Sequence, residues 1–202
     1  MSQCDNRPEK PPWSIDFDAA LAQLEAQLGP LPETTARPSL LMFCGLPGTG
    51  KSYFARRLAE RAGFAIVESD RVRKVLFSNP TYSTQESQGV HRLCHALLAR
   101  LLAKGFRVIY DATNLIEFHR EFVYLLAERA GAKLVIVRTW APEEVVRQRL
   151  MGRPADDYSD ADWNVYQALT QTEQPIRRPH LVVDTSQDPE AALSKILRAI
   201  KR

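Results

Sequence analysis

The chain has 202 residues, of which 45% are hydrophobic and 25% charged, a composition that predicts one globular domain and excludes a globally disordered or fibrous protein. Lysine and arginine number 27 against 24 aspartates and glutamates, and this net charge of +3 does not demand a nucleic-acid partner. The three cysteines are too scattered for a disulfide framework, and no apolar run approaches the roughly 20 residues of a membrane span, so we expect a cytoplasmic protein with reduced thiols.

The first 38 residues differ from the rest because they hold six of the 13 prolines. Between the proline-rich ends, apolar residues recur at helical spacing, at Phe17, Leu21, Leu24 and Leu28. This spacing predicts a helix over 15–28, which we expect to pack on the domain or to form a homodimer with a second copy. We therefore divide the chain into a proline-rich extension, 1–38, and a main domain, 39–202.

From residue 39 onward, short apolar runs alternate with longer amphipathic segments. The short runs suit buried parallel strands and lie at 40–44, 65–67, 107–110, 134–137 and 181–183. The amphipathic segments predict helices at 52–62, 90–103, 118–130, 143–152 and 188–200. This alternation predicts an α/β fold with helices on both faces of a parallel sheet.

A phosphate-binding loop is the strongest chemical signal. Its residues match the pattern GxxxxGK[ST] and are Gly45, Leu46, Pro47, Gly48, Thr49, Gly50, Lys51 and Ser52. The loop follows a predicted strand and opens a predicted helix, so its backbone N–H groups and the helix N-terminus can surround a polyphosphate. We expect Lys51 to reach the β- and γ-phosphates of ATP and the Ser52 hydroxyl to bind Mg²⁺. The alternative interpretation is a plain glycine turn.

Asp70 and Arg73 follow the second predicted strand. The carboxyl ends of strands line the ligand crevice of an open α/β sheet, so we expect Asp70 beside the γ-phosphate. There it can accept a proton from a hydroxyl acceptor or hold a Mg²⁺-bound water. Arg73 lies one helical turn further and can face the same acceptor. The structural alternative is that Asp70 only caps the next helix.

The third predicted strand leads into Asp111 and Asn114. A carboxylate at this place is typical of the acid that orients Mg²⁺ or the loop hydroxyl in phosphate-loop enzymes, so Asp111 is a candidate for the metal site. Asn114 can both donate and accept hydrogen bonds, and we expect it to hold the acceptor or the loop.

Arg149 and Arg153 lie four residues apart after the fourth predicted strand and share a helix face. We expect them to belong to a lid over about 149–164 that closes over ATP and neutralises the transferred phosphoryl group. The alternative for each arginine is a solvated surface position.

Two further pairs invite simpler interpretations. His91 and His95 lie four apart on a predicted helix, but no third ligand is apparent, so we expect no metal there. Trp163 and Tyr166 are expected either to stack on a base or sugar or to cover the sheet.

Together these segments resemble the P-loop kinases typified by polynucleotide 5′-hydroxyl kinases, an AAA-type ATP-binding group that includes zeta-type toxins, gluconate kinases and chloramphenicol phosphotransferases. The resemblance runs from about Ser39 to Asp184. It depends on the phosphate loop, Asp70-x-x-Arg73, Asp111-Ala-Thr-Asn114 with Arg120 downstream, and Arg149 to Arg153. It implies a three-layer α/β/α fold with five parallel strands in the order 2-3-1-4-5 and a helical lid.

The resemblance also implies roles for individual residues. Asp70 corresponds to the general base, Arg73 to a group that positions the acceptor or the phosphate, and Arg149 and Arg153 to the lid. Arg120 matches a recurring position of the group, and we expect it to contact the substrate.

We therefore expect a kinase that uses ATP and Mg²⁺ and phosphorylates a hydroxyl group of a nucleic-acid end or of a small molecule. Its catalytic residues would be Lys51, Asp70, Arg73, Arg149 and Arg153. Two alternatives stay open. A nucleoside monophosphate kinase uses the same fold but needs no hydroxyl base, and an ATP-binding regulator needs neither Asp70 nor the lid.

Overall fold

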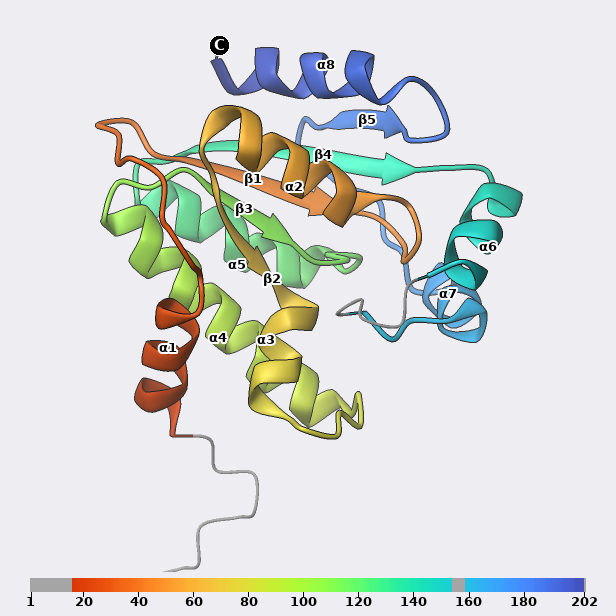
Figure 1. Cartoon of the computed structure of the whole chain (residues 1–202), viewed down its shortest axis with the longest axis horizontal. Helices are drawn as coiled ribbons and strands as arrows, with labels where there is room; N and C mark the ends of the chain where they lie inside the picture. The colour runs from red at the N-terminus through yellow and green to blue at the C-terminus, as the bar shows by residue number, and fades with distance from the viewer. Residues whose placement is uncertain (1–15, 154–158, 202) are drawn as a thin grey trace, which may run out of the picture.

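The computed structural model describes residues 16–153 and 159–201, and from β1 onward each strand is followed by one or two helices (Figure 1). The strands are β1 (Ser39–Cys44), β2 (Ala65–Glu68), β3 (Val108–Asp111), β4 (Lys133–Trp140) and β5 (Leu181–Asp184). The helices are α1 (Phe17–Ala26), α2 (Lys51–Ala62), α3 (Ser69–Leu76), α4 (Thr84–Ala103), α5 (Glu117–Arg129), α6 (Glu143–Met151), α7 (Trp163–Thr170) and α8 (Pro189–Lys201).

The five strands form one parallel sheet in the order β2-β3-β1-β4-β5, which confirms the predicted fold class and strand order. Strand β1 occupies the centre, where Leu41 pairs with Ile109 of β3 and with Val135 of β4. Because parallel strands end at the same edge, the loop after β1 lies beside the carboxyl ends of β3 and β4. The topology alone therefore places the phosphate loop next to Asp111.

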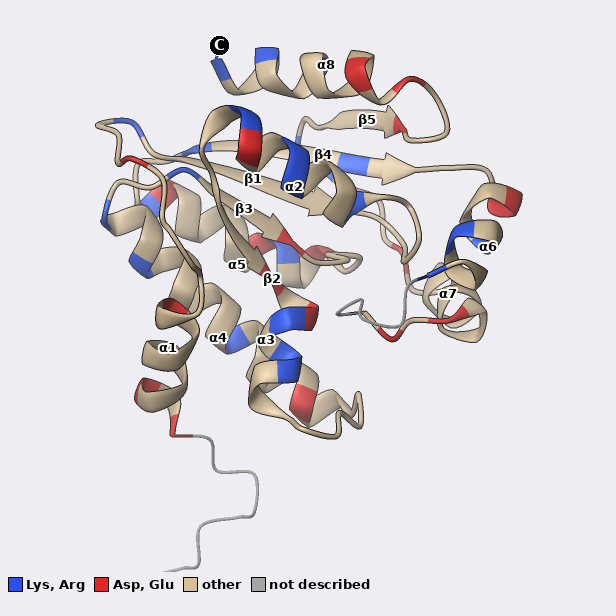
Figure 2. Ribbon diagram, in the orientation of Figure 1, with Lys and Arg blue, Asp and Glu red and all other residues tan. Residues whose placement is uncertain are grey.

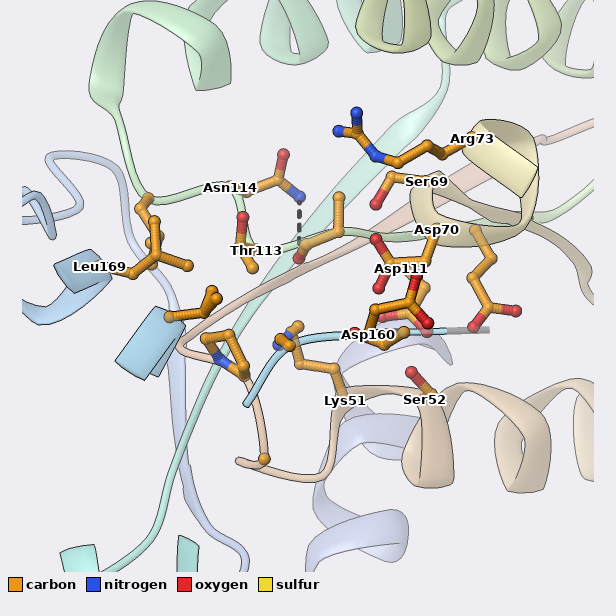
Figure 3. Close-up of a pocket in the computed structure, with 18 of the residues that line it drawn as sticks. Lys51, Ser52, Ser69, Asp70, Arg73, Asp111, Thr113, Asn114, Asp160 and Leu169 are labelled. Atoms are coloured by element: carbon orange, nitrogen blue, oxygen red, sulfur yellow. Dashed lines mark hydrogen bonds between the residues drawn. The ribbon is translucent and has the colours of Figure 1, made fainter. Parts of the chain in front are cut away.

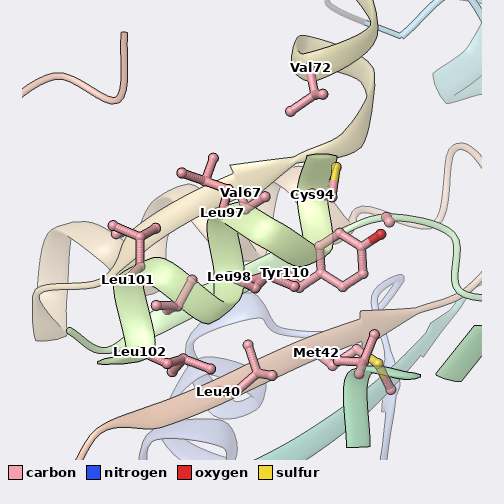
Figure 4. Packing of buried hydrophobic residues seen from close by; sticks show 14 of the residues in the cluster. Leu40, Met42, Val67, Val72, Cys94, Leu97, Leu98, Leu101, Leu102 and Tyr110 are labelled. Atoms are coloured by element: carbon pink, nitrogen blue, oxygen red, sulfur yellow. The ribbon is translucent and has the colours of Figure 1, made fainter. Parts of the chain in front are cut away.

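Successive side chains of β1 point to opposite faces of the sheet, and each face is covered by its own helices. Leu40 and Met42 belong to a core that includes residues of α1, α4 and α5 (Figure 4). Leu41 and Phe43 belong to a second core with α2 and α8. This arrangement explains why all six residues of β1 are buried and why its sequence is apolar without alternation.

Helix α1 packs against α4 of its own chain. Its apolar stripe of Ala20, Leu21 and Leu24 is buried, and Glu25, one turn after Leu21, forms ion pairs with Arg100 and Lys104 at the end of α4. The apolar surface that a homodimer through this helix would require is therefore already covered by the domain.

Two helices differ from the sequence prediction. Helix α4 begins at Thr84 instead of residue 90, because the Ser83 side chain accepts a hydrogen bond from the Glu86 N–H and caps an earlier turn. Helix α7 was not predicted. Its Trp163 and Tyr166 rings stack on each other with centroids 4.9 Å apart and pack on α6, so the expectation that they cover the sheet is wrong.

Candidate active site

The phosphate loop is held in shape by contacts within the protein. Gly48 has a φ of +76°, and a Cβ atom there would stand 2.9 Å from Cγ1 of Val146, so the position requires glycine. The Thr49 hydroxyl donates to the Leu46 carbonyl at 2.7 Å and lies 2.9 Å from the Thr139 hydroxyl of β4. The loop is thus fixed both to itself and to the neighbouring strand.

Lys51 is buried at the base of this loop, where it begins α2. Its ammonium group donates to the Leu46 carbonyl at 2.9 Å. Burial lowers the pKa of Lys51, while the nearby carboxylates of Asp111 and Asp70 oppose that shift. The lysine charge therefore lies in a confined space between the loop and two acids, which is suited to a phosphate group.

Asp111 is a buried acid at the end of β3. Its Oδ2 atom makes no hydrogen bond within the described part of the chain, and burial raises the pKa of the carboxyl, against the effects of Lys51 and a hydrogen bond from Ser52. A buried oxygen without a donor costs free energy unless another group satisfies it. A carboxylate beside a serine hydroxyl is a donor set that fits Mg²⁺, which also takes oxygens from phosphates and water.

Asp70 lies in the first turn of α3, directly after β2. Figure 3 shows Asp70, Asp111, Lys51 and Ser52 around one cavity, as predicted for the carboxyl edge of the sheet. The Asp70 charge favours the protonated form of Lys51 and contributes to the raised pKa of Asp111. The N-cap residue of α3 is Glu68, whose side chain makes no capping hydrogen bond, and Asp70 is the acid in the first turn of this helix.

The cavity is an open cleft of about 1490 Å³. Its lining comes from the phosphate loop and α2, from α3 and α4, from the connection between β3 and α5, and from α6, α7 and the residues between them. Figure 2 shows acidic residues gathered where β2 and β3 end, with basic residues on the adjoining helices. The cleft is large enough to hold two ligands side by side.

Arg73 lines the same cleft but is not a free cation. Its guanidinium is buried, forms an ion pair with Glu86, donates to the Ser87 hydroxyl at 3.2 Å and lies 4.6 Å from the centroid of the Tyr82 ring. The prediction located Arg73 correctly, yet it missed Glu86, because nothing in the sequence distinguishes this glutamate from a surface residue of a helix.

Asn114 lines the cleft, but its side-chain amide is hydrogen-bonded within the protein. It has a φ of +46°, and its amide donates to the Phe43 carbonyl of β1 at 2.7 Å. The Asn114 amide therefore holds the end of β1, two residues before the phosphate loop begins.

Arg120 is placed differently from the expectation, because it lies outside the residues that line the cleft. It is 1% exposed, and its guanidinium forms an ion pair with Glu117 and donates to the carbonyls of Asn114, Gln174 and Pro175. Arg120 therefore ties the end of β3 to the segment after α7, and a direct substrate contact is not supported.

Arg149 and Arg153 both line the cleft. Arg149 donates to the Thr185 hydroxyl at 2.9 Å and to the Gly48 carbonyl at 3.4 Å, so it links α6 to the phosphate loop. Arg153 donates to the carbonyls of Ser159 and Ala161. The predicted lid extends over 149–164, and its residues 154–158 lie outside the described residues.

An ion pair and a hydrogen bond across the cleft were not foreseen. The Tyr82 hydroxyl donates to Asp160 at 2.6 Å, and Lys74 lies 3.0 Å from the same carboxylate. These contacts join the segment after α6 to the α3–α4 region. Sequence reasoning could not find them, because the partners are 78 and 86 residues apart and belong to irregular segments or a helix surface.

His91 and His95 lie side by side on α4, among other aromatic rings. Within the described ranges, no three His, Cys, Asp or Glu side chains are placed to hold a metal ion together. The His91 ring stacks on His119 with centroids 5.5 Å apart, and its Nδ1 lies 3.1 Å from the Tyr110 hydroxyl. Burial lowers the pKa of both His91 and His95 to about 4, so these rings are neutral at pH 7.

The strand order and the phosphate loop together define a three-layer α/β/α P-loop fold. The chain belongs to the AAA domain family, whose model matches residues 40–176. The finer grouping with polynucleotide kinases and zeta-type toxins stays a prediction.

Among known proteins, the chain is similar to 6-phosphofructo-2-kinase/fructose-2,6-bisphosphatase 1 of Rattus norvegicus, with 24% identity over 155 residues that cover 65% of this chain and 32% of that enzyme. The chain thus spans about a third of the length of that relative. A UPF0200 protein of Saccharolobus islandicus is 29% identical over 136 residues, which cover 59% of this chain and 67% of that protein.

Two solved structures show the same fold. The APS kinase CysC of Mycobacterium tuberculosis, in complex with AMPPNP and APS, matches with a TM-score of 0.64 and 20% identity over 83% of this chain and 100% of that chain. Kti12 of Chaetomium thermophilum, in complex with ADP-AlF3, matches with a TM-score of 0.64 and 20% identity over 80% of this chain and 97% of that chain. At these identities the likeness concerns the fold alone.

Among the described residues, no helix is both long enough and apolar enough to cross a membrane.

Proposed function

We propose that the protein is an ATP- and Mg²⁺-dependent phosphotransferase that moves the γ-phosphate of ATP to a hydroxyl group. The observation that carries this proposal is the placement of Asp70 in the same cleft as Lys51 and the orphaned carboxylate of Asp111. One acid beside the phosphate loop fits a metal site, and a second acid is left for the acceptor.

In this mechanism the loop N–H groups and Lys51 hold the phosphates, and Arg149 and Arg153 line the same cleft, Arg149 next to the phosphate loop. Asp70 accepts the proton as the O–H bond of the acceptor breaks. The acceptor oxygen then bonds to the γ-phosphorus while the bond from that phosphorus to the β–γ bridging oxygen breaks, and ADP leaves. Ser52 and Asp111 would hold Mg²⁺, which neutralises phosphate charge when bound.

Asp70→Asn tests the base directly. We expect nucleotide affinity within about twofold of wild type and a loss of transfer of about 100-fold or more, because the amide cannot take the proton. Calorimetry with AMPPNP and Mg²⁺ measures binding, and γ-labelled ATP with a panel of nucleosides, sugars and 5′-hydroxyl oligonucleotides measures transfer.

The matched control is Asp18→Asn, an exposed acid on α1 that should change neither quantity. Full transfer by Asp70→Asn would remove the base from the mechanism. Nucleotide binding without transfer to any acceptor, in wild type as well, would favour an ATP-binding regulator.

A further inference from the structure

One wall of the cleft is formed by α3, by α4 and by the residues that join them. Six of its polar or charged side chains are Asp70, Arg73, Tyr82, Ser87, Gln88 and His91, and we call this side of the cleft the acceptor wall. Among the described residues that line it, Arg73 is the only arginine or lysine. The other cations of the cleft come from α2, α6 and the segment after α6, and they are Lys51, Arg56, Arg57, Arg149 and Arg153.

The charge of Arg73 is compensated inside the protein. Its Nη1 atom donates to Glu86, whose side chain also accepts from the Thr81 N–H at 2.7 Å and from the Thr81 hydroxyl at 2.8 Å. Burial acts to raise the pKa of the Glu86 carboxyl, but the hydrogen bonds from Thr81 and Arg73 outweigh it, so the pKa lies below its ordinary value. Glu86 is therefore a carboxylate at neutral pH.

Both ends of the Arg73 fork are occupied. Nη2 donates to Ser87, and the Tyr82 ring covers one face of the guanidinium. An anionic ligand is normally bound by a pair of parallel N–H groups of such a fork. Here it would have to displace Glu86, whose side chain is 6% exposed, and would leave a buried carboxylate without its partner.

One donor of Arg73 is left. Its Nε atom is buried and has no hydrogen-bond partner among the described residues. A single N–H suits an uncharged oxygen, such as a hydroxyl or a carbonyl. The remaining polar groups of the acceptor wall are a hydroxyl, an amide and an imidazole, from Ser87, Gln88 and His91, and the acid of the wall is Asp70.

Aliphatic side chains also line the cleft, among them Leu115, Val165 and Leu169, and Figure 3 shows Leu169 across the cavity from Arg73. Neutral hydrogen-bonding groups on the acceptor wall and aliphatic side chains elsewhere in the cleft suit a compound with several hydroxyls and an apolar face.

We infer that the acceptor is an uncharged polyhydroxylated small molecule of the sugar or nucleoside type, and that acceptors carrying a phosphate, sulfate or carboxylate group are rejected because Glu86 occupies Arg73. This inference depends on the phosphotransferase proposed above and names the substrate class of that same site. It also separates this protein from a nucleoside monophosphate kinase, whose acceptor is an anion.

Matched acceptors test the inference by activity. With γ-labelled ATP, each neutral compound is compared with a partner that differs by one anionic group: a nucleoside with its 3′-monophosphate, and an aldose with its aldonate. We expect kcat/KM to be at least about tenfold higher for the neutral member, which corresponds to about 1.4 kcal/mol. Preference for nucleosides or for sugars distinguishes the two sources, and equal or better use of the anionic members would overturn the inference.

A binding experiment tests the same inference without knowledge of the acceptor. The protein is first saturated with AMPPNP and Mg²⁺, so that the phosphate loop is filled, and sulfate is then titrated by calorimetry. We expect no uptake by wild type up to about 10 mM, and a new site of about 1 mM in Glu86→Gln, where the Arg73 charge is no longer balanced. Glu60→Gln, which removes an exposed acid of the same cleft, should gain no site.

Sulfate binding to saturated wild type with a Kd below about 1 mM, lost in Arg73→Gln, would overturn the inference. Circular dichroism checks that Glu86→Gln is folded; if it is not, the wild-type titration and the matched acceptors decide alone. Failure of AMPPNP to bind at the first step would instead overturn the proposed function, and with it the acceptor class.

Discussion

Asp111 illustrates how a single residue can serve a site at a cost to the isolated protein. Its carboxyl is buried, its pKa is raised by that burial, and its Oδ2 has no hydrogen-bond partner in the described part of the chain. Such a group is unfavourable on its own and becomes favourable when a cation lies against it. The strand that carries Asp111 explains its position, but only the proposed metal explains its chemistry.

Asp111→Asn should therefore weaken the dependence on Mg²⁺ selectively. We expect the Mg²⁺ concentration for half-maximal nucleotide binding to rise by about 10- to 100-fold, because the amide keeps the shape and loses the charge. Calorimetric titration of AMPPNP at a series of Mg²⁺ concentrations measures this shift. Binding measured in EDTA should change little, and an unaltered Mg²⁺ requirement would argue against the metal role.

The sequence predicted which residues lie at the cleft where a local motif marks them. It did not predict contacts between residues that are distant in the sequence. Lys51 was predicted from the phosphate-loop motif, and Asp70 and Asp111 were predicted because each follows a predicted strand. All three line the cleft, and their roles stay predictions. The partner of Arg73 and the buried position of Arg120 were missed, because both depend on tertiary contacts that no spacing in the sequence reveals.

At the scale of an element, the phosphate loop shows why its sequence pattern requires glycine at a given position. Gly48 adopts a left-handed conformation and is packed so closely by α6 that a methyl group would meet Val146 and Leu150 within about 3 Å. Backbone strain and steric contact therefore act at the same position.

Gly48→Ala should reduce nucleotide affinity by about tenfold or more and cost about 1–3 kcal/mol of stability, because the loop must shift away from α6. Fluorescence titration with a labelled ATP analogue and chemical denaturation measure the two effects. Gly29→Ala is the matched control: its φ is +75°, but nothing lies within 4 Å of an added Cβ, so only stability should fall. Equal losses of affinity in both variants would show that packing against α6 has no special role.

At the scale of the whole molecule, the alternation of apolar runs was sufficient to predict the α/β class, whereas the strand order came from the resemblance to P-loop kinases. The starts and ends of helices were less predictable, because capping contacts such as that of Ser83 compete with apolar periodicity. The role of α1 was open between the domain and a second copy, and the burial of Leu21 and Leu24 against the domain settles where its stripe packs.

The global stability should fall on mild acidification. Burial lowers the pKa of His95 to about 4 from an ordinary 6.5, so the folded state binds this proton less readily than the unfolded chain. This contribution to the free energy of unfolding is fully present above pH 6.5 and is lost as the pH falls toward 4. The loss at pH 5 is at most about 2 kcal/mol.

His95→Gln, which cannot titrate, should therefore lose less stability than wild type between pH 7 and pH 5. Urea denaturation at both pH values measures the difference, and His91 retains its own share in the variant. His180→Gln, at an exposed position before β5, should behave as wild type. A variant whose stability falls as steeply as that of wild type would contradict the assignment.

The most direct measurement of the central claim is a calorimetric titration of AMPPNP in Mg²⁺ buffer into wild type and into Lys51→Ala. We expect one nucleotide to bind each wild-type chain and the affinity of the variant to be at least about tenfold weaker, because a charged hydrogen-bond donor is lost from the phosphate site. Circular dichroism should show the same fold for both proteins. Equal affinity in the two proteins, or no binding to wild type, would contradict the account.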